Sequence, residues 1–573
     1  MRRGWHAIVL LVVIAGLAAA CREPVPPADL VLLGGKVLTV DEGFAMAEAF
    51  AVRDGRFVAV GTDTEVRQHV GPSTRVIEAR GRTVIPGIVD AHVHALDVAA
   101  AEATQPFRNL TTIPALQEWI REEAAKRPRG SWIWTPRVFP TRFREHRFPT
   151  RAELDAAAPN HPVVVDAAYA FSLNTAALRA AGITRKSPDP PGGAIVKDER
   201  GEPTGLLRNV GSLLAKFAPA QEAVPPQTLE DVHRRYLETG ITSVIERGAT
   251  LDGYRSYEQL RDANRLRVRS TVTVRIPQPR DADATEQFIR NLPFGPRDGD
   301  DWLKPGPLKI VADGGILIGT SFMREPYGPG TRMLYAVEDP DYRGFLTLEP
   351  AQIAAAIATV HRLGWQMLVH VTGDAGVDVV LDGFEAAQKA QPDTDRRHTV
   401  THAYFANRET AERAARLGVL IDTQPAWYFK DADALAEALG RERLAHFIGL
   451  KTWRDAGVTV AINTDHMFGL ERDTAMNPFN PFLTMYTATT RRTESGAVVS
   501  DADRVSREEA LRMMTRDAAR FSFDEASRGS IEPGKLADFV VLDRDFLTCS
   551  DEELRAIKPV LTVVGGSVAF ERR

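Results

Sequence analysis

Cysteine is scarce in this sequence. Only Cys21 and Cys549 occur among its 573 residues. Two thiols cannot form a disulfide framework, and they are too few for a metal site built from thiolates. Any metal in this protein must therefore be bound by histidine, aspartate, glutamate or a modified lysine.

A large excess of charge of one sign is also absent. The 71 Lys and Arg residues nearly balance the 76 Asp and Glu residues, which gives a formal net charge of −5. No basic block stands out in the sequence, so nucleic-acid binding has no electrostatic support. With 44% hydrophobic and 26% charged residues, the composition is that of an ordinary globular protein.

The first apolar run is typical of a targeting segment. Two arginines precede residues 7–20, an apolar stretch too short to span a membrane comfortably. Its end, LAAAC at residues 17–21, resembles a bacterial lipoprotein signal, in which the cysteine is lipidated and becomes the mature N-terminus. We therefore expect a signal at residues 1–21, a tether at 22–28, and an exported protein of the bacterial cell envelope, anchored to the membrane only through a lipid on Cys21. An ordinary cleaved signal is the alternative, because alanine replaces the usual leucine three residues before the cysteine.

Short strand-like runs at both ends of the chain predict one small domain. Residues 30–40, with a Gly-Gly turn, and residues 50–60 have hairpin patterns, and the far C-terminus has similar strands. Neither end alone has enough strands for a stable sheet. We therefore expect a composite β-sandwich made of residues 29–82 and 529–573.

Between these ends, apolar runs alternate with helical stretches, which indicates βαβ units and a parallel sheet. Eight runs are predicted strands, the number that closes a (β/α)8 barrel. They are residues 84–94, 241–247, 268–275, 308–313, 366–371, 399–403, 418–424 and 458–465. A further run at 162–166 falls within residues 99–230, which we treat as an insertion after the first strand. The predicted fold class is α/β, with a TIM-type barrel over residues 83–528 and the β-sandwich beside it.

Candidate metal ligands stand on five of these eight strands, mostly at the carboxyl end. His92 and His94 project to one face of the first strand together with Asp90, because residues two apart on a strand share a face. The active site of such a barrel gathers at the carboxyl ends of its strands. A single histidine, lysine or aspartate at such a position more often has a structural role than a metal-binding one. Suitable ligands on five of the eight strands, however, are hard to obtain by chance. The complete set is His92, His94, Lys309, His370, His402 and Asp465.

Four sequence motifs agree with one protein family. They are PGIVDAHVH at residues 86–94, HVTGD at 370–374, THA at 401–403 and GSIEPGKLAD at 529–538. With these motifs, the chain from about residue 29 onward resembles the metal-dependent amidohydrolase superfamily, and within it amidohydrolase family 3, the branch that contains N-substituted formamide deformylases. The branch usually has a histidine before the asparagine of the inserted segment, whereas residues 169–174 contain none.

The resemblance implies one or two divalent metal ions, with zinc as the expected metal. His92 and His94 would bind one ion, with Asp465 as a further ligand or as the general base beside it. His370 and His402 would bind the second ion.

Lys309 resembles the lysine that some members carboxylate with carbon dioxide, which gives a carbamate that bridges both ions. An ammonium cannot coordinate a metal, and a carbamate can. The implied reaction is hydrolysis of a non-peptide carbon–nitrogen bond, of the amide or N-formyl type, by metal-activated water. Asp465 would take the proton of that water and deliver it to the leaving nitrogen.

The expected partner is a small amide-type molecule, and a homo-oligomer is compatible with the sequence. The predicted substrate contacts are Asn174, Gln424, Trp427 and His466. The sequence leaves open the identity of the substrate, the number of metal ions and the carboxylation of Lys309.

Other activities are the alternatives to amide hydrolysis. A deaminase or an ester or lactone hydrolase would use the same barrel, but mononuclear deaminases usually place a glutamate beside the fifth-strand histidine, and residues 370–374 contain none. A non-catalytic binding lipoprotein is the alternative of another class. Loss of a metal ligand would indicate such a protein, and no ligand is lost.

Overall fold

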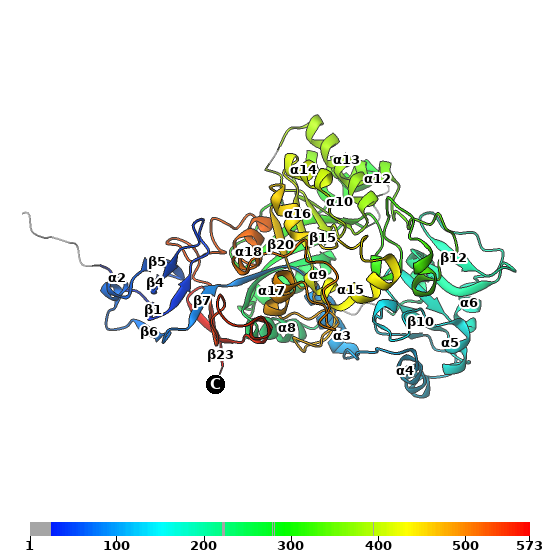
Figure 1. Cartoon of the computed structure of the whole chain (residues 1–573), viewed down its shortest axis with the longest axis horizontal. Helices are drawn as coiled ribbons and strands as arrows, with labels where there is room; N and C mark the ends of the chain where they lie inside the picture. The colour runs from blue at the N-terminus through cyan, green and yellow to red at the C-terminus, as the bar shows by residue number, and fades with distance from the viewer. Residues whose placement is uncertain (1–24, 220–223, 278, 280, 394, 573) are drawn as a thin grey trace, which may run out of the picture.

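The computed structural model describes residues 25–219, 224–277, 279, 281–393 and 395–572. Its largest sheet has eight strands, which pair in parallel in the order β20-β19-β18-β17-β16-β15-β14-β8 (Figure 1). An isolated parallel bridge between Val93 and His466 joins the first strand to the segment after the last one and closes the ring. The predicted barrel is therefore confirmed. Its strands are β8 (Ile88–Val93), β14 (Ile241–Ala249), β15 (Arg269–Arg275), β16 (Leu303–Val311), β17 (Met367–Val371), β18 (Thr399–His402), β19 (Leu420–Thr423) and β20 (Val460–Ile462).

Helices connect the barrel strands and cover the outside of the barrel (Figure 1). Ser506 and Glu509 form a capping box that opens the helix Arg507–Met513. The helices are α3 (Ala95–Thr104), α8 (Pro226–Glu238), α9 (Leu251–Asp262), α10 (Ala282–Arg290), α12 (Pro350–Arg362), α13 (Asp374–Ala390), α14 (Arg408–Arg416), α15 (Pro425–Leu439), α16 (Leu450–Asp455), α17 (Pro481–Thr490), α18 (Arg507–Met513) and α19 (Arg516–Ala519).

Strands from both ends of the chain form two small sheets, as the sequence predicts. One sheet has the order β5-β4-β1-β6, and the other has the order β23-β22-β21-β7-β2-β3. Their facing side chains share one apolar core, in which the ring of Phe50 lies 4.8 Å from that of Phe539. The strands are β1 (Leu30–Leu33), β2 (Lys36–Leu38), β3 (Met46–Ala47), β4 (Ala49–Arg53), β5 (Arg56–Gly61), β6 (Arg75–Glu78), β7 (Thr83–Pro86), β21 (Phe539–Leu542), β22 (Pro559–Val564) and β23 (Ser567–Glu571). The residue limits that we assigned to the domains stay a prediction.

The hairpin predicted at residues 30–40 is wrong. Its two strands, β1 and β2, belong to different sheets, because the chain crosses from one layer to the other at the Gly-Gly pair. Gly34 adopts a positive φ of 63° there, which a residue with a side chain rarely adopts. The hairpins at residues 50–60 and at the C-terminus are confirmed, since β4 pairs with β5 and β22 pairs with β23 in antiparallel registers.

The first predicted strand, residues 84–94, is in fact two strands in two sheets. β7 pairs with β2 and β21 in the six-stranded sheet, whereas β8 begins the barrel. Gly87 separates them at a place where a Cβ atom would lie 2.2 Å from Thr242 Oγ1. The strand that carries His92 is thus attached at its start to the small sheet.

A buried ion pair also joins the barrel to this sheet. Arg269 Nε, at the start of β15, donates to Asp538 Oδ2 at 2.7 Å, and Arg269 Nη2 donates to Asp538 Oδ1 at 3.0 Å. Both residues are buried. This two-point pairing is the strongest geometry available to a guanidinium and a carboxylate.

The insertion after the first barrel strand forms a separate five-stranded sheet with the order β12-β13-β11-β10-β9. It lies on the opposite side of the barrel from β1 and β4 (Figure 1). Its elements are α4 (Ile113–Lys126), β9 (Ile133–Trp134), α5 (Arg151–Ala157), β10 (Val163–Asp166), β11 (Ala170–Leu173), α6 (Thr175–Ala181), β12 (Ala194–Lys197) and β13 (Pro203–Arg208).

The predicted lipoprotein signal lies outside the described residues. Within the part of the chain that the structure describes, no helix combines the length and the apolar character needed to cross a membrane.

Candidate metal centre

Three ligand atoms converge where the first and the last barrel strands end. His92 Nε2 lies 3.3 Å from His94 Nε2, and Asp465 Oδ1 lies 3.4 Å from each of these nitrogens. Ligands of a tetrahedral zinc ion, each about 2.0–2.1 Å from the metal, are about 3.3–3.4 Å apart. The triangle therefore has the size that a small divalent ion requires on one face of its coordination tetrahedron.

The hydrogen bonds around this triangle leave its inner atoms free to bind a cation. Asp422 Oδ1 accepts from His92 Nδ1 at 3.1 Å, so the neutral ring carries its proton on Nδ1 and its lone pair on Nε2. Trp427 Nε1 donates to Asp465 Oδ2 at 2.9 Å. Asp465 Oδ1, in contrast, is buried and has no hydrogen-bond donor among the described residues. A buried carboxylate oxygen without a donor is costly, and a metal ion would satisfy it.

His370 and His402 form a second pair beside the triangle. His402 Nε2 lies 2.9 Å from His370 Nδ1, and the His402 ring lies 5.5 Å from the ring of His92. His370 Nε2 donates to the carbonyl of Gly314 at 3.0 Å, and His402 Nδ1 donates to Gln424 Oε1 at 2.6 Å. These outer bonds place a lone pair on both facing nitrogens. Two lone pairs at 2.9 Å repel each other unless a cation lies between or beside them.

Burial keeps these imidazoles neutral. It lowers the pKa of His92 and of His370 well below the ordinary value, and it also lowers the pKa of His402. Burial alone would raise the pKa of Asp465, but the imidazoles of His92 and His94 outweigh it and lower that pKa. Neutral imidazoles and an ionised carboxylate are the forms that bind a metal.

Lys309 is buried on β16 and points into the barrel, where only 5% of it is exposed. Its neighbour on β14 is Gly248, where a Cβ atom would lie 3.4 Å from the Cδ and 3.6 Å from the Nζ of the lysine. Burial lowers the pKa of Lys309 to about 8, against the opposing attraction of Asp465. No hydrogen bond holds its amine within the described residues. Lys309 is therefore an interior amine without a hydrogen-bond partner among the described residues.

Strained backbone conformations occur at the strand ends that carry the ligands. His402, Ala403 and Asp465 adopt φ angles of 79°, 44° and 48°, which non-glycine residues rarely adopt. Asp465 N donates to the carbonyl of His92 at 3.0 Å, and His94 N donates to that of His466 at 2.8 Å. These bonds across the barrel seam hold the strained segment and fix the distance between the histidines and the aspartate.

The structure assigns other roles to two of the predicted substrate contacts. Asn174 is fully buried at the start of α6, and its amide donates to the carbonyls of Ala158 and His161. His466 is fully buried too, with Nδ1 2.9 Å from the Tyr236 hydroxyl and Nε2 2.7 Å from the Gly469 carbonyl. Every polar atom of these two side chains has a partner inside the protein, and their contact with a substrate stays a prediction.

The other two predicted contacts lie at the site but act on its ligands. Gln424 accepts from His402 and donates to Asp422 Oδ1 at 3.0 Å, and Trp427 donates to Asp465. Both side chains are buried. They orient the candidate ligands, and their contact with a substrate stays a prediction. Asp90, which the strand pattern groups with His92, instead accepts from the Thr464 hydroxyl at 2.6 Å and holds the last strand end.

Three residues of this network were not predicted. Asp422 accepts from His92, Gln424, the Thr401 hydroxyl and, at 3.1 Å, Arg247 Nη2, and all of these groups are buried. Arg247 and Thr401 also come from barrel strands. The signal that could reveal Asp422 is its position at the end of the seventh strand, since the neighbouring strands end in candidate ligands.

The insertion also reaches the site. The ring of Tyr169, which follows β10, lies 5.4 Å from the ring of His370. This tyrosine belongs to the segment in which the resembling family usually has a histidine. Tyr169 is therefore a side chain of the insertion that lies next to a candidate ligand of the metal centre.

Comparisons with known proteins agree with this geometry. The sequence model of the amidohydrolase family matches residues 75–570. An N-substituted formamide deformylase of Arthrobacter pascens is 31% identical over 562 residues, which cover 95% of this chain and 98% of that protein. A metal-dependent hydrolase of Pyrococcus horikoshii has a similar structure, with a TM-score of 0.65 and 20% identity over 91% of this chain and 99% of its own. A zinc-bound adenosine deaminase of Xanthomonas campestris shares the fold, with a TM-score of 0.51 and 16% identity over 96% of this chain and 94% of its own.

The Asp422→Asn variant tests the network behind the ligands. It removes the negative charge that fixes the His92 proton on Nδ1, so we expect metal affinity to fall by about 10- to 100-fold. The measurement is a competition titration of the metal against a chelator. Asp538→Asn is the matched control, because it removes a buried carboxylate paired with Arg269 and should lower the melting temperature without changing metal affinity. Unchanged metal affinity in Asp422→Asn would contradict the role of Asp422.

Proposed function

Since this chain belongs to the amidohydrolase family and is a metal-dependent hydrolase of carbon–nitrogen bonds, we propose that it cleaves an amide or N-formyl bond of a small molecule. The single observation that supports this reaction is the triangle of His92 Nε2, His94 Nε2 and Asp465 Oδ1 beside the His370–His402 pair. The formamide deformylase relative is the reason to place N-formyl compounds first among the substrates.

The donor set fits one or two divalent ions, and we propose zinc. An ion held by these residues would acidify water and polarise a carbonyl oxygen. Neutral imidazole nitrogens and one carboxylate are ligands that zinc commonly takes, and His94 is the partly exposed member through which the site meets solvent.

Asp465 is the group placed to move the proton. Its Oδ2 is held by Trp427, so the carboxylate keeps its orientation while Oδ1 faces the two histidines. A carboxylate in this position can accept a proton from the attacking water and return it to the leaving nitrogen. The held orientation matters because proton transfer requires the acceptor within hydrogen-bond reach.

The structure also bears on the deaminase alternative. A shuttle carboxylate near the fifth strand would have to be Asp374, since no glutamate follows His370. Asp374 Oδ1 instead accepts the backbone N–H groups of Arg324 at 2.8 Å and Ala375 at 3.0 Å. This carboxylate is used in backbone hydrogen bonds at the start of α13, which favours hydrolysis with Asp465 as the proton carrier.

The Asp465→Asn and His370→Ala variants separate proton transfer from metal binding. Asp465→Asn should keep much of the bound metal and lose about 10²–10⁴ in turnover, because it removes the proton acceptor. His370→Ala should lower metal content and turnover together. The measurements are metal analysis and hydrolysis of a panel of amides and N-formyl amines at saturating zinc. Hydrolysis by Asp465→Asn at the wild-type rate would reject the proposed role of the aspartate.

We also propose that carbon dioxide carboxylates Lys309. The uncharged amine would attack the carbon of carbon dioxide and lose one proton, leaving a carbamate with two oxygens in the interior of the barrel. A pKa of about 8 leaves a usable fraction of the amine uncharged near neutral pH. Because Gly248 has no side chain, none projects toward the end of Lys309 from this position, which supports the proposal.

Carbon-13 NMR tests this modification. Protein equilibrated with ¹³C-bicarbonate and zinc should show one carbamate resonance, which Lys309→Met should lack. Lys304→Met is the control, because this second lysine of β16 pairs with Asp524 outside the metal centre. A spectrum of Lys309→Met that keeps the resonance, or a wild-type spectrum without it, would contradict the proposal.

Export to the cell envelope is proposed from the sequence of residues 1–21. The wild-type protein should appear in the membrane fraction of a bacterial host and incorporate labelled fatty acid. Cys21→Ser should lose the label and leave the membrane fraction, and Cys549→Ser should behave as the wild type. Finding unmodified wild-type protein in the cytoplasm would show that the interpretation is wrong.

A further inference from the structure

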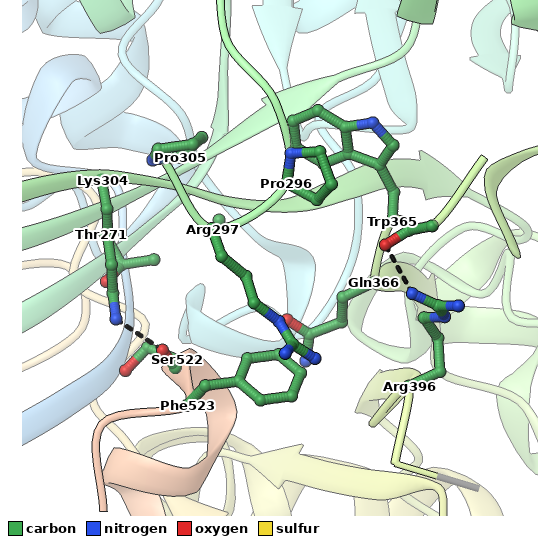
Figure 2. A pocket seen from close by; sticks show the side chains of 12 residues that line it. Thr271, Pro296, Arg297, Lys304, Pro305, Trp365, Gln366, Arg396, Ser522 and Phe523 are labelled. Atoms are coloured by element: carbon green, nitrogen blue, oxygen red, sulfur yellow. Dashed lines mark hydrogen bonds between the residues drawn. The ribbon is translucent and has the colours of Figure 1, made fainter. Parts of the chain in front are cut away.

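A cavity of about 210 Å³ opens at the amino-terminal face of the barrel, opposite the strand ends that carry the candidate metal ligands. Figure 2 shows side chains that line it. Lys304, the second residue of β16, and Gln366, which immediately precedes β17, line its floor. Its apolar walls include Pro296, Trp365 and Phe523. The cavity therefore combines flat hydrocarbon surfaces with polar groups from two barrel strands.

One cation of this cavity has no counter-ion. Lys304 pairs with Asp524, and Arg396 Nη2 pairs with Asp393 at 2.6 Å. Arg297 is exposed, and within the described residues its guanidinium makes no ion pair and no hydrogen bond. Its contact is with the ring of Phe523, whose centroid lies 4.0 Å away. A guanidinium without a carboxylate at the edge of a cavity can bind an anion through two parallel N–H groups.

The other arginine of the cavity, Arg396, is held by the protein. Arg396 Nη1 donates to the Gly364 carbonyl at 2.6 Å, as Figure 2 shows. The Nε atom of the same side chain is buried and has no acceptor among the described residues. This atom has no exposed surface, so a ligand in the cavity would not reach it.

The aromatic wall is held in an unusual conformation. Phe523 has a φ of 58°, which is rare for a residue with a bulky side chain. Its ring is held between two cations, since the guanidinium of Arg397 also lies 4.3 Å from the ring centroid. Arg397 has its own carboxylates in Asp395 and Glu525. The excess positive charge at this wall is therefore that of Arg297.

We propose that this cavity binds a small aromatic carboxylate. A dry cavity of about 150 Å³ accommodates benzene, so a volume of about 210 Å³ has room for a ring with a carboxylate group. The carboxylate would meet Arg297, and the ring would lie against Trp365. This site is separate from the metal centre, and its existence does not depend on the proposed hydrolysis.

Calorimetric titration of the metal-loaded full-length protein with benzoate tests the proposal. Arg297→Gln should weaken benzoate binding by about tenfold or more, because it removes a charge-assisted contact. Arg297→Lys, which keeps the charge but loses the planar fork, should bind with intermediate affinity. Arg408→Gln is the matched control, since Arg408 lies on the exposed face of α14 and pairs with Glu412. Higher salt should weaken binding to the wild type.

Two further probes define the ligand class. Benzyl alcohol has the ring without the charge, and acetate has the charge without the ring, so both should bind more weakly than benzoate. The proposal is overturned if benzoate does not bind, or if benzyl alcohol binds equally well. It is also overturned if Arg297→Gln binds benzoate as tightly as Arg408→Gln does, because the ion would then lie at the metal centre or elsewhere. Hydrolytic activity is not the readout, so failure of the proposed function would leave this test intact.

Discussion

The metal centre depends on one buried carboxylate, that of Asp422. It accepts from His92 on one side and from Gln424 on the other, and Gln424 in turn accepts from His402. The Asp422 carboxylate thus sets the proton position of His92 directly and that of His402 through Gln424. Arg247 Nη2, also fully buried, donates to the other oxygen at 3.1 Å and balances the charge. Removing either charge would leave the other one buried without compensation.

The closure of the barrel brings the two ends of the sequence into this network. His92 and Asp465 are 373 positions apart, yet Asp465 N donates to the His92 carbonyl. The first strand is also attached at Gly87 to the small sheet, where no side chain would fit. The distances within the ligand triangle are therefore set by sheet hydrogen bonds on both sides. Such rigid support is what a preorganised metal site needs.

The sequence could predict where the candidate ligands lie because their signal is local. A histidine or aspartate that ends an apolar run must lie at the rim of a parallel barrel, so His370, His402 and Asp465 could be placed without knowing any contact. The strand count could be predicted for the same reason. The break at Gly87 could not, since a continuous apolar run does not reveal that its two halves pair with different sheets.

Substrate contacts were harder to predict, because a polar residue near a strand end can either contact a substrate or form a hydrogen bond to another side chain of the protein. Gln424 and Trp427 follow the seventh strand and lie beside the ligands, but their polar atoms are directed at His402 and Asp465. Asn174 caps a helix in the insertion, and sequence spacing alone does not predict where its side chain points. Which partner a side chain finds depends on tertiary contacts, and these are absent from a pattern along one chain.

The strands β16 and β17 have functional groups at both of their ends. Lys304, at the start of β16, lines the 210 Å³ cavity, and Lys309 of the same strand lies beside the candidate metal centre. Gln366, just before β17, lines the same cavity, and His370 of β17 is a candidate ligand. In a parallel barrel, neighbouring strands start at one face and end at the other, so two polar sites on the same strands are separated by the packed interior. The residues between them, such as Leu308 and Val369, are fully buried and apolar. That layer separates Arg297 from the candidate metal ligands, so the proposed anion site and the proposed metal site would not compete with each other.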